Sequence, residues 1–183
     1  MEHKIERWET LHSEYLFKRP WLTVRRDKVQ LPNGTIHDEY YVLEYPTWVN
    51  VIAITEDGEF VMVEQYRHGL EQVFTELVAG VAEPGEKPLD AAKRELAEET
   101  GYTGGKWVLN TVLSANPGST NNLTYSFIAT GVSKTENTRL DSTEDLRTRL
   151  LTEAEVLEIL KNDELKQSLM AAPLWKYFAT KQK

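Results

Sequence analysis

The stretch that decides the fold reads Gly80-Val-Ala-Glu-Pro-Gly-Glu86-Lys-Pro88-Leu-Asp-Ala-Ala-Lys-Arg94-Glu95-Leu96-Ala-Glu98-Glu99-Thr-Gly101-Tyr102. Pro88 suits the first turn of a helix, because an N–H at that position would have no partner within the helix. Residues 89–100 are mostly strong helix formers, and Gly101 stands where the end of a helix favours positive φ. The stretch therefore predicts a loop, a helix of about three turns and a sharp stop.

Four glutamates give this stretch its chemical character. Glu95, Glu98 and Glu99 are spaced i, i+3 and i+4, so their side chains share one helical face, and Glu86 lies in the preceding loop. Like charges about 6 Å apart repel by roughly 3 kcal/mol at an effective dielectric near 20. We expect Arg94 to pair with one carboxylate only, which leaves the others for a hard divalent cation such as Mg²⁺. Taken alone, three glutamates on a helix fit a solvated acidic face better than a metal site.

The complete spacing is more specific than the glutamates alone. Seven fixed positions and one apolar position would match by chance on the order of once in 10⁹ starts. The pattern resembles the Nudix box, the motif of hydrolases that cleave a nucleoside diphosphate linked to another moiety, and only Tyr102 departs from it, at a position that is usually aliphatic. It reads Gly80-x5-Glu86-x7-Arg94-Glu95-Leu96-x-Glu98-Glu99-x-Gly101-Tyr102.

Two runs before the box narrow the resemblance. Glu64-Gln-Tyr-Arg67-His-Gly69 and Glu76-Leu-Val-Ala79-Gly80 are similar to the ADP-ribose pyrophosphatase branch of the family. The resemblance implies that Arg67 binds the phosphates of the substrate and that the backbone carbonyl of Ala79 ligates a metal ion. From the residues alone, an ion pair of Arg67 with Glu64 or Glu71 is an equally good interpretation.

The resemblance also assigns roles to the box residues. It implies catalytic roles for Glu98 and for Arg94, which would orient a ligating glutamate. The implied metal ligands are Ala79, Glu86, Glu95, Glu98 and Glu99, and the implied ion is Mg²⁺, with Mn²⁺ as a substitute.

Other candidate site residues lie outside the box. Pro117 and Gly118 follow Gly101 at close to the spacing of the branch, although Asn121-Asn122 stand where its members often carry an acidic residue. Trp21, in an aromatic-rich N-terminal segment, is a candidate for stacking on a nucleobase or lining a dimer interface, and core packing is the alternative.

A general base is expected in the polar segment 131–145, which we interpret as a mobile loop. Carboxylates that hold a metal are poor proton acceptors, so a separate carboxylate must activate the water. The resemblance places it near Ser142-Thr-Glu144-Asp-Leu-Arg, with Glu144 first and Asp141 and Asp145 behind it. A solvated loop carboxylate is an equally good interpretation of Glu144.

Composition limits the remaining classes. The chain has 183 residues, 40 % of them hydrophobic and none of them Cys, which suits one domain with a small extension and excludes disulfides and thiolate metal sites. The four histidines, at positions 3, 12, 37 and 68, have no ligand spacing. With no membrane-length apolar run and no signal-peptide core at the N-terminus, we expect a cytoplasmic protein. The net charge of −8 argues against nucleic acid as a partner.

The rest of the chain predicts an alternation of strands and helices. Residues 1–46 favour a small antiparallel unit, and residues 49–55 a central buried strand. Gly104-Gly105 is interpreted as a turn before a strand at 107–113, and Thr152-Glu-Ala-Glu155 as a helix-starting capping box. A last helix is expected over about 163–179, kinked or broken at Pro173.

The resemblance thus implies a Nudix α/β/α sandwich, with a mixed sheet between helices. Residues 1–46 would form an N-terminal antiparallel subdomain for dimerisation and substrate contacts, and residues 47–183 the hydrolase domain. The implied reaction is Mg²⁺-dependent hydrolysis of a nucleoside diphosphate sugar, first of all ADP-ribose to AMP and ribose 5-phosphate, by a homodimer. The alternatives are another Nudix substrate (a GDP- or UDP-sugar, a dinucleoside polyphosphate or an oxidised nucleoside triphosphate) and a sensor that binds ADP-ribose without cleaving it.

Overall fold

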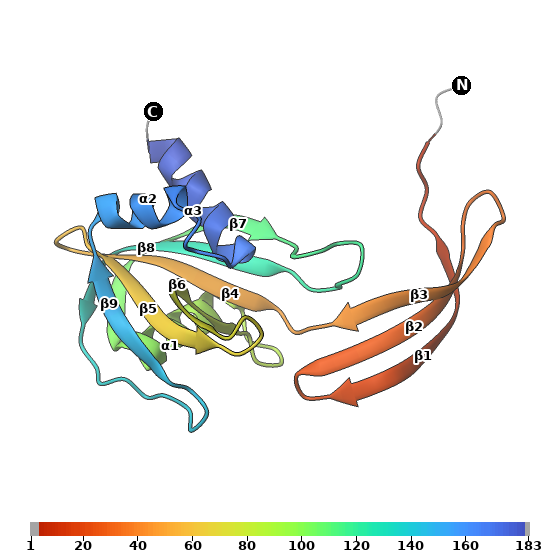
Figure 1. Cartoon of the computed structure of the whole chain (residues 1–183), viewed down its shortest axis with the longest axis horizontal. Coiled ribbons are helices and arrows are strands. Elements are labelled where there is room, and N and C mark those ends of the chain that lie inside the picture. Colours follow the sequence, from red (N-terminus) through yellow and green to blue (C-terminus); the bar gives the residue numbers. More distant parts are fainter. Residues whose placement is uncertain (1–3, 182–183) are drawn as a thin grey trace. The chain divides into compact units, whose positions relative to one another are not determined.

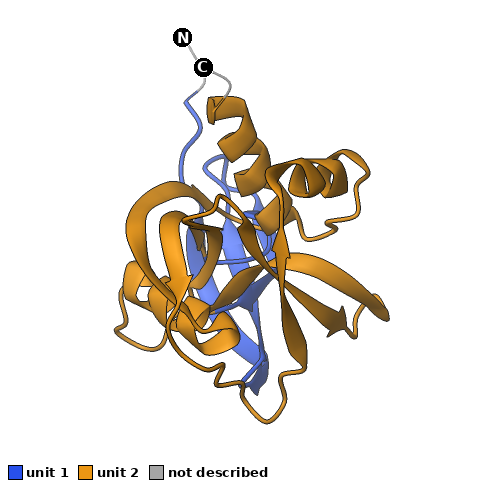
Figure 2. Cartoon of the chain, turned by 90° about the vertical axis from the view of Figure 1, so that its left-hand side faces the viewer, with its two compact units in different colours: residues 1–45, 116–122 blue, residues 46–115, 123–183 orange. Residues whose placement is uncertain are grey.

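The computed structural model describes residues 4–181, so His3 and the first residues of the N-terminal segment lie outside the described part. It forms two compact units (Figure 2). The first unit runs to Tyr45 and also takes in the loop Asn116–Asn122. The second unit holds Pro46–Ala115 and the chain from Leu123 onward.

The first unit is a three-stranded antiparallel sheet in the order β1-β2-β3. Its strands are β1 (Glu9–Arg19), β2 (Leu22–Gln30) and β3 (Ile36–Glu44). The loop Asn116–Asn122 joins this unit through Leu43, whose N–H donates to the carbonyl of Ser119 at 2.7 Å. Sequence reasoning did not associate this loop with the N-terminal segment, because the contact bridges more than seventy residues of chain.

The second unit contains a six-stranded mixed sheet in the order β7-β8-β4-β6-β5-β9. β4 pairs in parallel with β8 and antiparallel with β6, so it is the central strand that the apolar run predicted. The strands are β4 (Trp48–Thr55), β5 (Phe60–Arg67), β6 (Gln72–Val81), β7 (Tyr102–Leu113), β8 (Thr124–Lys134) and β9 (Leu146–Leu151).

Helices cover both faces of this sheet (Figure 1). The helices are α1 (Pro88–Thr100), α2 (Glu153–Lys161) and α3 (Ser168–Lys181). Alternate residues of β4 separate the two cores: Val51 packs under α1 with Leu96, whereas Ile52 packs under α2 and α3 with Leu174. This period-two alternation confirms the predicted sandwich of a mixed sheet between helices.

Two predicted boundaries were wrong around β7 and β8. Gly104 and Gly105 do not turn the chain; they lie inside β7 with φ of 75° and 74°. A Cβ on Gly105 would stand 2.7 Å from the carbonyl oxygen of Thr130, so the close approach of β8 requires glycine there. Residues 131–134, expected in a loop, extend β8 instead, because they pair with the first residues of β7.

The last helix also differs from its prediction. α3 begins at Ser168, where the side chain of Gln167 accepts a hydrogen bond from the N–H of Leu169 at 3.0 Å. It continues through Pro173, which has no N–H for the carbonyl of Leu169. The buried side chain of Asn50 on β4 donates to that carbonyl at 2.8 Å, so the sheet supplies the missing donor and the helix does not break.

Candidate active site

The candidate active site is built around the C-terminal half of α1, the loop before this helix and the end of β6. Pro88 occupies the first turn, and Gly101 closes the helix with φ of 76° while its N–H donates to Ala97 at 2.8 Å. The helix therefore forms as the sequence predicted. Its buried face, which includes Leu96, packs on the sheet and fixes the direction of the glutamates.

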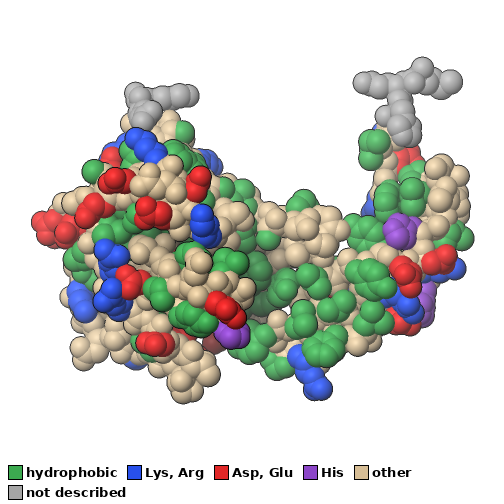
Figure 3. Space-filling model, in the orientation of Figure 1, with side chains coloured by type: hydrophobic (Ala, Val, Ile, Leu, Met, Phe, Trp, Pro, Cys, Tyr) green, Lys and Arg blue, Asp and Glu red, His purple; other side chains and the backbone are tan. Residues whose placement is uncertain are grey.

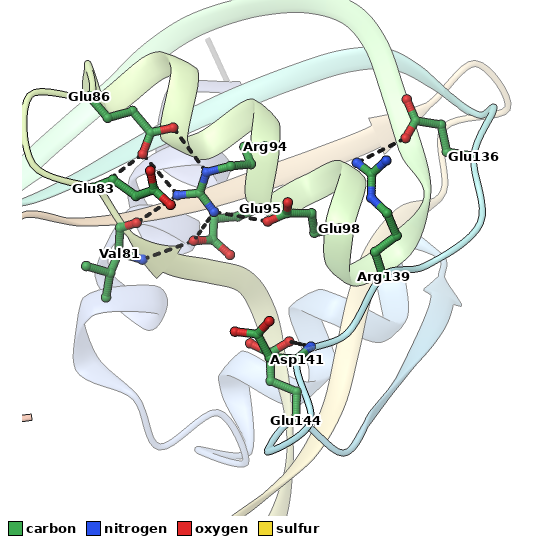
Figure 4. A network of polar contacts seen from close by, with 10 residues as sticks. All are labelled: Val81, Glu83, Glu86, Arg94, Glu95, Glu98, Glu136, Arg139, Asp141 and Glu144. Carbon is green, nitrogen blue, oxygen red and sulfur yellow. Dashed lines mark hydrogen bonds and ion pairs between the residues drawn. The ribbon is translucent and has the colours of Figure 1, made fainter.

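Arg94 lies at the centre of the carboxylate cluster (Figure 4). Its guanidinium donates to both oxygens of Glu86 at 3.1 and 3.0 Å, to Glu95 at 2.9 Å and to Glu98 at 3.0 Å. It also donates to the carbonyl of Val81 at 2.9 Å. The expectation of a single carboxylate partner was wrong, because the planar guanidinium presents five donors and the fold brings Glu86 within reach.

These contacts have clear electrostatic consequences. The hydrogen bonds that Arg94 donates to Glu86, followed by the charge of Glu95 and the hydrogen bond to Glu98, outweigh burial and raise the pKa of Arg94 above its ordinary value. The hydrogen bonds from Arg94 lower the pKa of Glu86. Arg94 thus offsets part of the repulsion between the glutamates, which the sequence analysis assigned to a bound cation.

Glu95 lies against the backbone of β6. A carboxylate oxygen of Glu95 accepts from the N–H of Val81 at 3.3 Å. Burial raises the pKa of Glu95, although Arg94 acts in the opposite direction. This position is possible because residue 80 is glycine, which leaves space for the carboxylate above the strand.

Glu99 is the most buried of the four glutamates, with 5 % of its surface exposed. Its Oε2 atom has no hydrogen-bond partner in the described part of the chain. Burial, with the charges of Glu95 and Glu144 adding to it, raises the pKa of Glu99 to about 8. A buried, unpartnered carboxylate oxygen beside further carboxylates is a donor set that suits a hard divalent cation.

The glutamates nevertheless do not form a ready-made metal site. Among residues 4–181, no group of three or more His, Asp or Glu side chains is arranged to hold an ion. The reason is visible in Figure 4, where Glu86, Glu95 and Glu98 all turn toward Arg94. The residues fit a divalent ion in chemistry and proximity, and binding would redirect carboxylates that now contact the guanidinium.

Arg67, at the end of β5, has a partner that sequence reasoning missed. It pairs with Glu76 on β6, from Nη2 at 2.5 Å and Nε at 2.9 Å, rather than with Glu64 or Glu71. Glu64 is instead paired with Arg147 and with a second arginine of β9. The available signal was Glu76 itself, the single carboxylate of β6.

The segment 135–145 continues from β8 along the end of α1. The N–H of Glu136 donates to the carbonyl of Gly101 at 3.1 Å, and the N–H of Arg139 donates to that of Glu98 at 2.8 Å. Farther on, the N–H of Asp141 donates to the carboxylate of Glu144 at 2.9 Å. Figure 4 shows Asp141 and Glu144 together on this segment. The part of the segment near α1 is therefore anchored, and Glu144 is close enough to influence Glu99.

A cavity of about 200 Å³ adjoins the end of β6. Ala79, Gly80 and Arg67 line it on one side, and the first turn of α3 lines it on another. Whole-ligand pockets are usually about 300 to 1,000 Å³, so this cavity suits one part of a nucleotide-sized substrate. A larger cavity, of about 340 Å³, lies between the start of β6 and the α2–α3 connection, and no box residue lines it.

The remaining predicted site residues belong to the first unit. Trp21 is 82 % exposed beside the β1–β2 turn, so the core-packing alternative for it was wrong. Pro117 and Gly118 lie in the loop beside β3, where the hydroxyl of Tyr40 donates to the carbonyl of Gly118. Their contribution to the site of the second unit stays a prediction.

A helix that carries several glutamates lies on one face of a mixed sheet, and a glycine near the end of the preceding strand makes room for one of these glutamates. Together these features define a Nudix-type hydrolase. The chain belongs to the Nudix family: residues 44–172 match the NUDIX domain, and residues 8–43 match the nucleoside diphosphate sugar hydrolase N-terminal domain. The predicted fold, family and enzyme class are thereby confirmed.

Individual relatives agree with this membership. The chain is 36 % identical over 168 residues to the methanol dehydrogenase activator of Bacillus methanolicus, covering 90 % of this chain and 89 % of the relative. It is 33 % identical over 158 residues to the ADP-ribose pyrophosphatase of Bacillus subtilis (strain 168), covering 86 % and 85 %. A crystal structure of an ADP compounds hydrolase superposes with a TM-score of 0.85 at 20 % identity, over 97 % of this chain and 96 % of that one, and shows the shared fold.

Each helix in residues 4–181 is too short or too polar to cross a membrane.

Proposed function

We propose that this protein hydrolyses the pyrophosphate bond of a nucleoside diphosphate sugar, with ADP-ribose as the first candidate, giving AMP and ribose 5-phosphate. The observation that carries the proposal is the convergence of Glu86, Glu95, Glu98 and Glu99 at the end of β6, in a chain whose relatives include an ADP-ribose pyrophosphatase. The N-terminal match to nucleoside diphosphate sugar hydrolases supports the same substrate class.

Mg²⁺, with Mn²⁺ as a substitute, is the proposed cofactor. Glu86, Glu95, Glu98, Glu99 and the carbonyl of Ala79 would hold it. When bound, the ion would neutralise charge that develops on the phosphates and lower the pKa of a coordinated water. Because the proposed chemistry depends on an ion held by these carboxylates, full turnover in excess chelator would contradict this assignment.

The chain's own residues would do the rest. Arg67 would bind a phosphate of the substrate, and Arg94 would orient a ligating glutamate. Glu144 would accept the proton of the attacking water as a P–O bond of the anhydride breaks and the leaving phosphate departs. In support of this role, the N–H of Arg139 donates to the carbonyl of Glu98 and anchors the segment that carries Glu144 to the end of α1.

The substrate identity is tested by a panel with Mg²⁺. It contains ADP-ribose, GDP- and UDP-sugars, a dinucleoside polyphosphate and an oxidised nucleoside triphosphate. We expect ADP-ribose to have the highest kcat/KM. Preference for another compound would reassign the substrate, and the panel is broad because a relative of similar identity is named for a different role. Tight ADP-ribose binding without turnover would favour the sensor alternative.

We further propose that the protein is a homodimer in which the first unit forms the interface. We also propose that it acts in the cytoplasm. A small sheet needs at least three strands with a hydrophobic face, or a helix packed on it, to be stable, and this one leaves large apolar side chains exposed, seen in Figure 3 over the N-terminal strands. The exposed set includes Trp8, Leu11, Tyr15, Leu16, Phe17 and Trp21. Sedimentation should give twice the chain mass for the parent protein and the chain mass for Leu16→Glu. A monomeric parent would contradict the dimer.

A further inference from the structure

Glu76 is a buried carboxylate in the wall of the candidate site. Its side chain is 4 % exposed, whereas that of Arg67 is 43 % exposed. A buried carboxylate is stable only with charged or hydrogen-bonding partners. Three nitrogen atoms point at one of its oxygens: Nε of Arg67 at 2.9 Å, Nη2 of Arg67 at 2.5 Å and Nε2 of Gln65 at 3.3 Å.

The strand pairing places these three side chains on the face of the sheet that α1 covers. Antiparallel pairing joins Val63 to Glu76 and Gln65 to Phe74, so Gln65, Arg67 and Glu76 share one face of the β5–β6 hairpin. That face continues into the core under α1, which contains Val63 and Val78. The positive charge of Arg67 also reaches Glu99 on α1.

The contacts to Glu76 use one edge of the guanidinium. Nε and Nη2 both donate to Glu76, which fixes the plane of the group and leaves Nη1 outside this ion pair. Arg67 lines the 200 Å³ cavity beside Ala79 and Gly80 and also a neighbouring cavity of about 300 Å³ that Glu76 lines. The side chain therefore stands where two cavities meet, with its other edge free to face a ligand.

The geometry points to Glu76 as a positioning residue, which holds Arg67 in the orientation that binds a phosphate of the substrate. In this role Glu76 acts through Arg67 and not on the substrate directly, since only 4 % of its side chain is exposed. Without it, the arginine would keep its charge but lose its fixed plane, and ordering the side chain would cost part of the binding energy. This inference rests on the proposed phosphate-binding role of Arg67.

The test is a double-mutant cycle on Arg67→Ala and Glu76→Gln, with KM, kcat and the calorimetric Kd of ADP-ribose as readouts. Glu76→Gln keeps the shape of the side chain and an acceptor oxygen but removes the charge. We expect KM and Kd to rise about 10- to 100-fold, the range for a hydrogen bond to a charged group, with kcat within about threefold, because binding in the ground state is what suffers. If Glu76→Gln is too unstable to assay, Glu76→Asp retains the charge one methylene farther away and should raise KM in the same direction.

The double variant distinguishes positioning from independent binding. Once Arg67 is absent, Glu76 has nothing to position, so KM of the double variant should equal that of Arg67→Ala. Its melting temperature should exceed that of Arg67→Ala, because the latter leaves a buried carboxylate without its partner. Glu64→Gln is the matched control and should leave KM unchanged. Glu64 lies on the same strand as Arg67, but it pairs with arginines of β9.

Two outcomes separate this inference from the proposed function. If Arg67→Ala raises KM while Glu76→Gln and Glu76→Asp do not, the positioning role is wrong and the proposed phosphate contact stands. The positioning role would also be wrong if the two effects on KM multiplied, so that KM of the double variant was higher than that of Arg67→Ala. If Arg67→Ala leaves both KM and Kd unchanged, the phosphate contact itself is wrong, and the role of Glu76 falls with it.

Discussion

The carboxylate of Glu95 lies directly over the Cα atom of Gly80. A Cβ at position 80 would stand 2.1 Å from Cδ of Glu95 and 2.2 and 2.5 Å from its oxygens. The glycine of the box is thus required by a close approach, because any side chain on β6 at this point would displace a proposed metal ligand.

This relationship makes Gly80→Ala a sharp test of the site. The added methyl group should push the carboxylate of Glu95 away, lower kcat by at least about tenfold and raise the Mg²⁺ concentration needed for half-maximal rate. Gly69→Ala is the control, because Gly69 has no positive φ and open space around its Cβ position. Steady-state rates over a Mg²⁺ titration decide the matter, and a Gly80→Ala protein with parental Mg²⁺ dependence would show that Glu95 is not a ligand.

A second prediction concerns competition between Arg94 and the metal ion. Arg94→Ala leaves Glu86, Glu95 and Glu98 without their shared cation, so the metal-free protein should melt at a lower temperature. Mg²⁺ should then raise the melting temperature by more than it does in the parent protein, since the ion replaces the lost charge.

The control for that experiment is Lys93→Ala. Lys93 lies over the ring of Trp107, away from the cluster, and its loss should not change the Mg²⁺-dependent shift. A shift in Arg94→Ala that is equal to the parental one, or smaller, would mean that Arg94 does not compete with the ion for these carboxylates.

The buried Glu99 predicts an unusual pH dependence for the metal-free protein. Its pKa is about 8 in the folded state against an ordinary value of 4.5, so the folded chain binds more protons between these two pH values. The free energy of unfolding contributed by this group is fully present below pH 4.5 and is lost as pH rises toward about 8.

Glu99→Gln removes this titration. In chelator, its melting temperature should match or exceed that of the parent at pH 8, and its loss of stability between pH 5 and pH 8 should be smaller, while activity with Mg²⁺ falls by orders of magnitude. Glu98→Gln serves as the comparison because 34 % of that side chain is exposed. Unfolding of Glu99→Gln at every pH would assign the glutamate a structural role.

The last prediction concerns the proton acceptor. Glu144→Gln should lower kcat by roughly 10²- to 10⁴-fold, the range for a general base, with little change in KM. The variant retains an oxygen that can accept from the N–H of Asp141, so the turn should survive. Asp145→Asn is the comparison at a second candidate base, and it should change kcat much less. A kcat of Glu144→Gln within threefold of the parent would transfer the search to Asp141 and Asp145.

Several elements of the second unit are determined by local sequence signals. The helix with Pro88 in its first turn and Gly101 at its end, the capping box of α2 at Thr152, and the central position of β4 were all predictable. Each depends on backbone preferences or on side-chain spacing within a few residues, which the sequence states directly.

Tertiary structure decided what those side chains meet. The sequence placed Glu95, Glu98 and Glu99 on one helical face, but only packing against the sheet buried Glu99 and left Glu98 partly exposed. Arg67 pairs with Glu76 because of the register of the β5–β6 hairpin, and α3 continues through Pro173 because Asn50, 119 residues away from Leu169, donates to its carbonyl. Such partners depend on strand order and register, which bring together residues that no local spacing relates.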